Sequence, residues 1–259
     1  MTDSNQLMCE FLKKHEEVEL NGVMSCRRCG EVIRKRVSSY SGGQLNIPLY
    51  HGTSSLYLES IKRLGLGGVN PYSKYNIRDY LKKNLSLYES IYDDACKKNI
   101  DVLHRDIPPS IIKATIEREG GQQFSFLYEG TNFTPSKNKA QDYAQNPLGE
   151  LLYSVYVFDL ALSQSKLYTR PTTWDENGLA YLLSNLEKHS PIVFKLESIP
   201  LAWLQSESGE DPREIVSYID ENLFRLGSNS EQFDSMLQQS NFRILQNIPY
   251  GRMKIVSFE

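Results

Sequence analysis

Apolar and polar residues follow patterns along this chain that predict a mixture of short strands and helices. From Tyr75 to Asn99, apolar side chains recur every three or four residues, which is the spacing of one helix face. The run from Leu151 to Leu160 is rich in tyrosine and valine and predicts a buried strand, and Ile192 to Leu196 predicts another. Because strands and helices do not alternate regularly, the pattern predicts an α+β fold.

Further helices are predicted where apolar residues keep helical spacing: Pro109 to Glu119, Glu176 to Lys188, Arg213 to Leu226 and Glu231 to Gln239. Short strands at Arg243 to Leu245 and Lys254 to Phe258 complete the predicted sheet. Near the N-terminus, Asn21-Gly22 is typical of a two-residue hairpin turn between the strands Glu19-Leu20 and Val23-Met24.

Around residue 50, the sequence predicts a strand that leads directly into a helix. Residues 47–50 are the strand, and His51-Gly52-Thr53 comes next. Ser54 or Ser55 is expected to cap the helix, which ends at Gly65. This arrangement places a histidine at an exposed strand end. Because the glycine has no Cβ, a flat ligand such as nicotinamide could lie against its backbone while the histidine and threonine side chains bind a polyol.

A second strand and helix are predicted from Tyr128 to Ala144, in the sequence Tyr-Glu-Gly-Thr-Asn-Phe-Thr-Pro-Ser-Lys-Asn-Lys-Ala-Gln-Asp-Tyr-Ala. The two segments resemble signature motifs of the ADP-ribosyltransferase superfamily, in the branch with poly(ADP-ribose) polymerases and diphtheria toxin. The first resembles the His-Gly-Thr motif. The second resembles a Gly-x-Tyr-Phe strand followed by a helix with Ala-x-x-Tyr, and the order of the motifs is also that of the family.

This resemblance implies two small, mostly antiparallel sheets that form a split β-sandwich, with a helical insertion between the motifs and NAD in the cleft between the sheets. No Gly-x-Gly-x-x-Gly sequence comes after a predicted strand, which disfavours a Rossmann dehydrogenase. NAD is therefore expected as a substrate and not as a redox carrier.

The resemblance also implies roles for individual residues. His51 matches the family histidine that binds the hydroxyls of the nicotinamide-side ribose, with Thr53 close to it in sequence. Gly52 matches the residue whose backbone binds the carboxamide. The family usually has a stacking tyrosine at the second position, where Asn132 is aligned in this chain. The stacking aromatic is left open among three candidates: Phe133, Tyr143 and Tyr128.

The third family position is a glutamate on a late strand, which stabilises the oxocarbenium-like transition state as nicotinamide leaves. Residues 241–249 resemble that strand but contain no glutamate, and an amide, Asn241 or Gln239, stands where the carboxylate is expected. Glu197, in the comparable segment 192–200, is the alternative carboxylate. Three explanations stay open: a different register, an inactivating substitution, or a family member that works with another third residue.

The N-terminal region carries potential metal ligands. Cys9, His15, Cys26 and Cys29 have the spacing Cys-x5-His-x10-Cys-x2-Cys. Zinc prefers four nitrogen or sulfur ligands in a tetrahedron, and a Cys-x2-Cys turn presents two thiolates from one loop. The spacing predicts a structural zinc site in a zinc-ribbon-like module over residues 1–36. The alternative is three unconnected thiols and a surface histidine in a disordered leader.

Basic residues surround this predicted zinc site: Arg27, Arg28, Arg34, Lys35 and Arg36. The cluster suggests contact with nucleic-acid phosphates, although a short charged run is more often a solvated face. The net charge of the chain is -3, so any nucleic-acid contact is expected to be a local patch.

The predicted organisation is the zinc-ribbon-like module over 1–36, a linker over 37–46 with Gly42-Gly43, and an ADP-ribosyltransferase-like catalytic domain over 47–259. A chain of 259 residues with 40% hydrophobic content is long enough for one sizeable core. No apolar run approaches the roughly 20 residues that span a bilayer. No membrane partner is expected, and the predicted location is the cytoplasm.

The predicted function is mono-ADP-ribosyl transfer from NAD to a macromolecule, with RNA or DNA favoured over protein because of the basic zinc module. A toxin of a toxin–antitoxin or phage-defence system, with an antitoxin partner, would fit by family analogy. Two alternatives stay open. An RNA 2'-phosphotransferase would need paired arginines and a second histidine, for which His104-Arg105 is the nearest match. A catalytically silent module that binds ADP-ribose or RNA is supported by Asn132 and Asn241.

Overall fold

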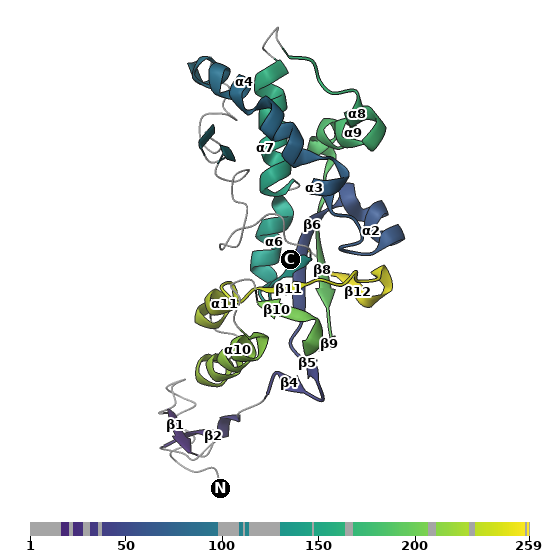
Figure 1. Cartoon of the computed structure of the whole chain (residues 1–259). Helices are drawn as coiled ribbons and strands as arrows, with labels where there is room; N and C mark the ends of the chain where they lie inside the picture. The colour runs from purple at the N-terminus through teal and green to yellow at the C-terminus, as the bar shows by residue number, and fades with distance from the viewer. Residues whose placement is uncertain are drawn as a thin grey trace. The chain divides into compact units, whose positions relative to one another are not determined.

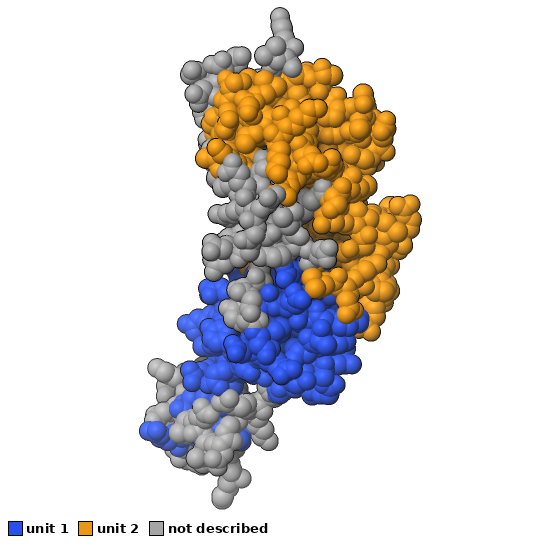
Figure 2. Space-filling model, in the orientation of Figure 1, with its two compact units in different colours: residues 1–50, 132–138, 196–244 blue, residues 51–131, 139–195, 245–259 orange. Residues whose placement is uncertain are grey.

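The structure is a computed structural model of the whole chain (Figure 1). It describes residues 17–20, 23–27, 32–35, 38–97, 109–110, 112–113, 130–146, 148–163, 168–206, 211–227, 231–256 and 258. These residues form small, largely antiparallel sheets together with helices, which confirms the predicted α+β class. The chain divides into two compact units, shown in Figure 2: unit 1 comprises residues 1–50, 132–138 and 196–244, and unit 2 comprises residues 51–131, 139–195 and 245–259.

Three small sheets belong mainly to unit 1 in the described part of the chain. Their strands, in spatial order, are β1 (Glu17–Leu20), β2 (Val23–Cys26) and β3 (Val32–Lys35); β4 (Tyr40–Ser41), β5 (Gln44–Leu45) and β9 (Ile199–Pro200); and β10 (Leu204–Ser206), β11 (Phe242–Ile244) and β7 (Thr131–Phe133). In the first sheet Leu20 pairs with Val23, which leaves two residues for the turn. This register confirms the predicted N-terminal hairpin.

Two helices of unit 1, α10 (Pro212–Leu226) and α11 (Glu231–Leu237), lie where the sequence predicted helices. Asp211 caps α10, because its side chain accepts a hydrogen bond from Arg213 N at 2.9 Å, and a proline occupies the first helical position. Gly227, with a φ of 77°, ends the helix. The 3-10 turn η3 (Leu201–Trp203) connects β9 to β10.

The segment predicted as a linker contains an ordered hairpin. β4 and β5 pair across Gly42 and Gly43, whose positive φ values of 58° and 81° suit a two-residue hairpin turn. β5 also pairs with β9. Ser39 N donates to Asp220 Oδ1 of α10 at 2.7 Å. Residues 38–45 are therefore held by pairing within unit 1.

In unit 2, one sheet has the order β12-β8-β6, and helices occupy much of the chain between β6 and β8. The strands are β6 (Leu49–Ser54), β8 (Pro191–Leu196) and β12 (Met253–Val256). The helices are α2 (Leu58–Leu64), α3 (Pro71–Lys74), α4 (Ile77–Lys97), α6 (Lys137–Gln145), α7 (Gly149–Ser163), α8 (Thr173–Asn177) and α9 (Leu179–Ser184). The 3-10 turns are η1 (Ser55–Tyr57), η2 (Leu186–Lys188) and η4 (Tyr250–Arg252). The first two residues of β6 and of α6 belong to unit 1.

The core of unit 2 lies where α4 packs against α7 (Figure 1). It is rich in aromatic side chains. Tyr88 and Phe158 stack with their ring centroids 3.8 Å apart, and Tyr80 contacts Trp174 at 4.7 Å. The helix predicted over Tyr75 to Asn99 is confirmed as α4, and the strand predicted over Ile192 to Leu196 is confirmed as β8.

The prediction of a strand over Leu151 to Leu160 is wrong, because these residues are part of the helix α7. Its apolar residues surround the helix almost completely, with Val155, Val157 and Phe158 all fully buried. A segment that is buried on every side has no periodicity to separate helix from strand, and only its length of 15 residues indicates a helix.

Other predicted elements differ in their limits. The helix predicted over Glu176 to Lys188 is divided into α8, α9 and η2, because Gly178 adopts a left-handed conformation with φ 83°. Of Pro109 to Glu119, residues 109–110 and 112–113 are helical, and the remainder lies outside the described residues. Among the helices that the structure describes, none has the length and apolar character needed to cross a membrane.

Candidate functional site

The first motif forms a strand that runs directly into a helix, as predicted. β6 includes the whole His-Gly-Thr sequence, so His51 lies within the strand and not at its end, and it is half-buried together with the two residues after it. Ser54 is fully buried, and its Oγ accepts a hydrogen bond from Leu56 N at 3.2 Å. This contact begins η1 and then α2, which identifies Ser54 as the cap.

Residues close to the C-terminus hold the end of α2. Leu66 and Ile248 exchange two backbone hydrogen bonds of 2.9 Å, and Asn247 Nδ2 donates to Leu64 O at 2.6 Å. Gly65 ends the helix with φ 80°, and a Cβ added there would lie 2.7 Å from Ile248 O. Both conformation and space therefore require glycine at this position.

The second motif contains β7, a short turn and α6. In β7, Asn132 is exposed, whereas Phe133 is on the buried face. Thr134 then pairs with Tyr50 of the first motif: Tyr50 N donates to Thr134 O at 2.7 Å, and Thr134 N donates to Tyr50 O at 3.0 Å. The strand segments of the two motifs are therefore joined by backbone hydrogen bonds, although the motifs are about 80 residues apart in sequence.

The two motifs also meet within unit 2, where α6 packs directly on Gly52. A Cβ added to Gly52 would lie 2.7 Å from Ala144 N and closer still to Ala140 O. Ala140 and Ala144 are fully buried and lie one helical turn apart, so small side chains on one helix face allow this close approach. The space on the Cβ side of Gly52 is therefore filled by the backbone of α6, which explains why this position is a glycine.

The candidate stacking aromatics differ sharply in exposure. Phe133 is 2% exposed and belongs to the core, whereas Tyr143 on α6 is 59% exposed. Lys139 Nζ lies 5.8 Å from the centroid of the Tyr143 ring. Tyr128 lies outside the described residues. Among the described candidates, Tyr143 is the one whose ring is accessible to a ligand.

The third position remains an amide in the structure. Asn241 is half-buried and directly precedes β11, and Gln239 is exposed in the turn that follows α11. β11 and β7 are neighbours in one sheet, so the second and third positions lie on adjacent strand segments of unit 1. Glu197 is exposed after β8, next to Ser198, which has a positive φ of 52°.

The predicted site residues fall into two groups. His51, Gly52, Thr53 and Tyr143 belong to unit 2, where the packing of α6 on β6 holds them in one substructure. Asn132, Phe133 and Asn241 belong to unit 1.

Sequence reasoning missed a polar cluster around Asp234 of α11. The carboxylate accepts hydrogen bonds from Ser136 Oγ at 2.9 Å, Asn138 Nδ2 at 2.9 Å and Gln238 Nε2 at 3.0 Å. Partial burial acts to raise the pKa of Asp234, but the three hydrogen bonds outweigh it, and the pKa is lower than the ordinary value. No spacing in the sequence predicts this cluster, because Asp234 is about 100 residues from two of its donors.

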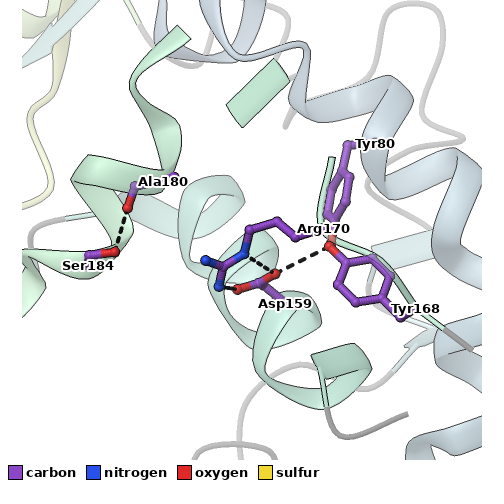
Figure 3. A network of polar contacts seen from close by, with 6 residues as sticks. All are labelled: Tyr80, Asp159, Tyr168, Arg170, Ala180 and Ser184. Carbon is purple, nitrogen blue, oxygen red and sulfur yellow. Dashed lines mark hydrogen bonds and ion pairs between the residues drawn. The ribbon is translucent and has the colours of Figure 1, made fainter. Parts of the chain in front are cut away.

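A second polar cluster lies among the helices of unit 2 (Figure 3). Asp159 on α7 is 3% exposed and accepts two hydrogen bonds from the Arg170 guanidinium and one from Tyr168 Oη at 3.2 Å. Tyr80 Oη lies 2.8 Å from Tyr168 Oη, and the guanidinium lies over the ring of Trp174. Burial is the main cause that raises the pKa of Tyr168 to about 12, so this phenol stays protonated and can donate. The signal in the sequence is a lone acid inside an apolar run.

The predicted zinc site is described only in part. Cys26, the last residue of β2, is 1% exposed, and Arg27 after it is exposed. The other predicted ligands, Cys9, His15 and Cys29, lie outside the described residues. Within the described ranges, the structure contains no group of three or more His, Cys, Asp or Glu side chains placed to hold a metal ion.

Comparison of the chain with protein-family models, with curated proteins and with solved structures finds no match.

Proposed function

We propose that this chain is a mono-ADP-ribosyltransferase that cleaves NAD and transfers ADP-ribose to a macromolecular acceptor. The observation that carries the proposal is the contact between the two motifs. β6 with His51 and α6 with Tyr143 pack together so closely that Gly52 tolerates no side chain. Two segments that resemble two parts of one site, and that lie far apart in sequence, are therefore parts of one substructure.

The exposed and half-buried residues around this contact have the chemistry that NAD requires. In the proposed roles, His51 and Thr53 bind the ribose hydroxyls, the Gly52 backbone binds the carboxamide, and the accessible ring of Tyr143 stacks on nicotinamide. The bond between nicotinamide and its ribose breaks, and nicotinamide leaves with the bonding electrons. An acceptor nucleophile then bonds to the same ribose carbon and loses its proton to solvent.

The amide at Asn241 limits the reaction that we propose. A carboxylate stabilises an oxocarbenium-like transition state by its charge and can activate a sugar hydroxyl, whereas a neutral amide offers only a dipole. We therefore propose single transfer and not polymer synthesis. Nucleic acid is the favoured acceptor, because the N-terminal residues around Arg27 and Arg34 are basic.

The test is incubation of the full chain with labelled NAD, total RNA, DNA and lysate protein. We expect label in the nucleic-acid fraction. His51→Ala should reduce labelling at least about 100-fold, because the substrate loses a group that orients it. His189→Ala is the matched control, because His189 is also half-buried in unit 2 but its Nδ1 lies 3.0 Å from Leu186 O, outside both motifs. It should label like the wild type.

A second candidate function is supported by the same two amides. Asn132 and Asn241 stand where the family has a stacking tyrosine and a catalytic glutamate, so the chain could bind ADP-ribose or RNA without turnover. Binding of NAD without any labelled fraction would favour this silent module over the transferase. Asn241→Glu would then be expected to restore NAD cleavage, and its failure to do so would argue that the third position lies elsewhere, with Glu197 as the next carboxylate to test.

A further inference from the structure

We propose that Asp234 is a positioning residue for the second motif: its carboxylate holds the turn between β7 and α6 through hydrogen bonds from Ser136 and Asn138. The inference rests on the proposed function, because it adds a residue to the same site. Asp234 belongs to neither motif, and it comes from α11, about 100 residues later in the chain.

Both carboxylate oxygens of Asp234 are engaged. Oδ1 accepts from Ser136 Oγ at 2.9 Å, and Oδ2 accepts from Asn138 Nδ2 at 2.9 Å and from Gln238 Nε2 at 3.0 Å. Ser136 is fully buried, and its backbone N also donates to Thr134 Oγ1 at 3.2 Å. Hydrogen bonds to a charged acceptor are stronger than neutral ones, so this carboxylate fixes the turn more firmly than the neutral contacts do.

The carboxylate of Asp234 also offsets the positive charge at the start of α6. The first turn of α6 has no acidic residue, and it carries two lysines, Lys137 and Lys139. Positive charge at a helix N-terminus is unfavourable, because the unpaired backbone N–H groups there already carry partial positive charge. Asp234 contacts the residues on either side of Lys137, at the place where α6 begins, and it supplies the negative charge that the first turn of the helix lacks.

The turn matters for the site because it precedes the helix that carries the proposed ligand contacts. α6 includes Ala140 and Ala144, which pack on Gly52, and Tyr143, the proposed stacking residue. When the start of a helix loosens, the side chains one and two turns later lose their fixed positions with it. NAD would then bind only to the fraction of molecules in which α6 is formed, so the apparent affinity would fall by that fraction.

The experiment compares the full-length wild type with Asp234→Ala, Asp234→Asn and the control Glu231→Ala, which removes an exposed carboxylate from the same helix. Hydrogen exchange of residues 137–145 and NAD kinetics are measured at a temperature where all variants are folded. For Asp234→Ala we expect exchange at least about tenfold faster at the start of α6, from the loss of charged hydrogen bonds. KM for NAD should rise by a similar factor, with kcat nearly unchanged at saturating NAD.

The conservative variant separates positioning from general stability. Asn keeps one acceptor oxygen without the charge, so Asp234→Asn should lie between Ala and the wild type in both exchange and KM, while Glu231→Ala matches the wild type. The inference would be overturned if Asp234→Ala left hydrogen exchange in α6 unchanged. It would also be overturned if exchange rose equally across the whole chain while KM for NAD stayed the same. If the wild type itself transfers nothing, the proposed function fails, and the exchange of α6 alone then decides the role of Asp234.

Discussion

At the scale of single residues, Gly52 lies where a strand and a helix approach more closely than a side chain permits. Ala140 O and Ala144 N occupy the direction in which a Cβ would project. The sequence singled out this glycine for its lack of a Cβ, and the contact with α6 gives a physical reason for that lack. A backbone carbonyl cannot move aside as a flexible side chain can, so the strand and helix must separate to admit even a methyl group.

We therefore predict that Gly52→Ala lowers the free energy of unfolding by about 1–3 kcal/mol, the usual cost of inserting a methyl group into a filled site. Gly251→Ala is the control, because a Cβ there meets nothing within 4 Å and its φ is not positive. It should change the free energy by less than about 0.5 kcal/mol. Urea unfolding of both variants measures the difference, and equal midpoints would show that α6 can shift away from β6 at little cost.

At the scale of secondary-structure elements, the buried Asp159 connects α7 to the segment immediately after it. Arg170 reaches the carboxylate from the chain after α7, and Tyr168 and Tyr80 extend the contact to α4. A charge as buried as Asp159 is tolerated because its oxygens are paired and hydrogen-bonded. The network thereby fixes residues 168–170, shortly before α8, against the α4–α7 pair.

Removal of the cation that pairs with Asp159 should therefore destabilise the folded protein. We predict that Arg170→Leu destabilises the protein by about 3–5 kcal/mol, because it leaves the carboxylate of Asp159 buried without its cation. The double variant Asp159→Leu/Arg170→Leu should recover much of that loss. The exposed pair of Glu59 and Lys62, at 2.8 Å, is the control, and Glu59→Gln should leave the melting temperature nearly unchanged. Thermal unfolding compares them, and equal costs at the two pairs would contradict the prediction.

At the scale of the whole molecule, the proposed function divides two tasks between regions of the chain. NAD chemistry is assigned to the substructure of β6 and α6, and acceptor binding to the basic N-terminal residues with the predicted zinc ligands. A module of 36 residues is too small to be held together by a hydrophobic core alone, so a metal is expected to provide the stability that it lacks. Cys26, the described member of the predicted ligand set, is buried at the end of β2.

We predict that the purified chain contains one zinc ion, measured by elemental analysis, and that Cys26→Ser loses it. Cys96→Ser, outside the predicted ligand set, should retain the metal. A strong chelator should abolish labelling of nucleic acid while NAD cleavage without acceptor persists. Equal loss of both activities would argue against this division of tasks, and a metal-free purified chain would favour unconnected thiols.

The sequence by itself determined the elements whose pattern is local. Helical spacing located α4, α10 and α11, the Asn-Gly pair indicated the N-terminal hairpin, and Ser54 and Gly65 marked the limits of the helix after His51. Each of these features depends on residues within one or two turns of one another, so their signals are present in the chain without any fold.

Only the tertiary structure decided the features that depend on distant contacts. It made Leu151 to Leu160 a helix because burial on all sides removed the periodicity, and it brought Asp234 to Ser136 and Arg170 to a buried Asp159. It also separated the exposed ring of Tyr143 from the buried ring of Phe133, which the sequence could not rank. Burial and long-range pairing arise from packing between segments far apart in the chain, so no local pattern encodes them.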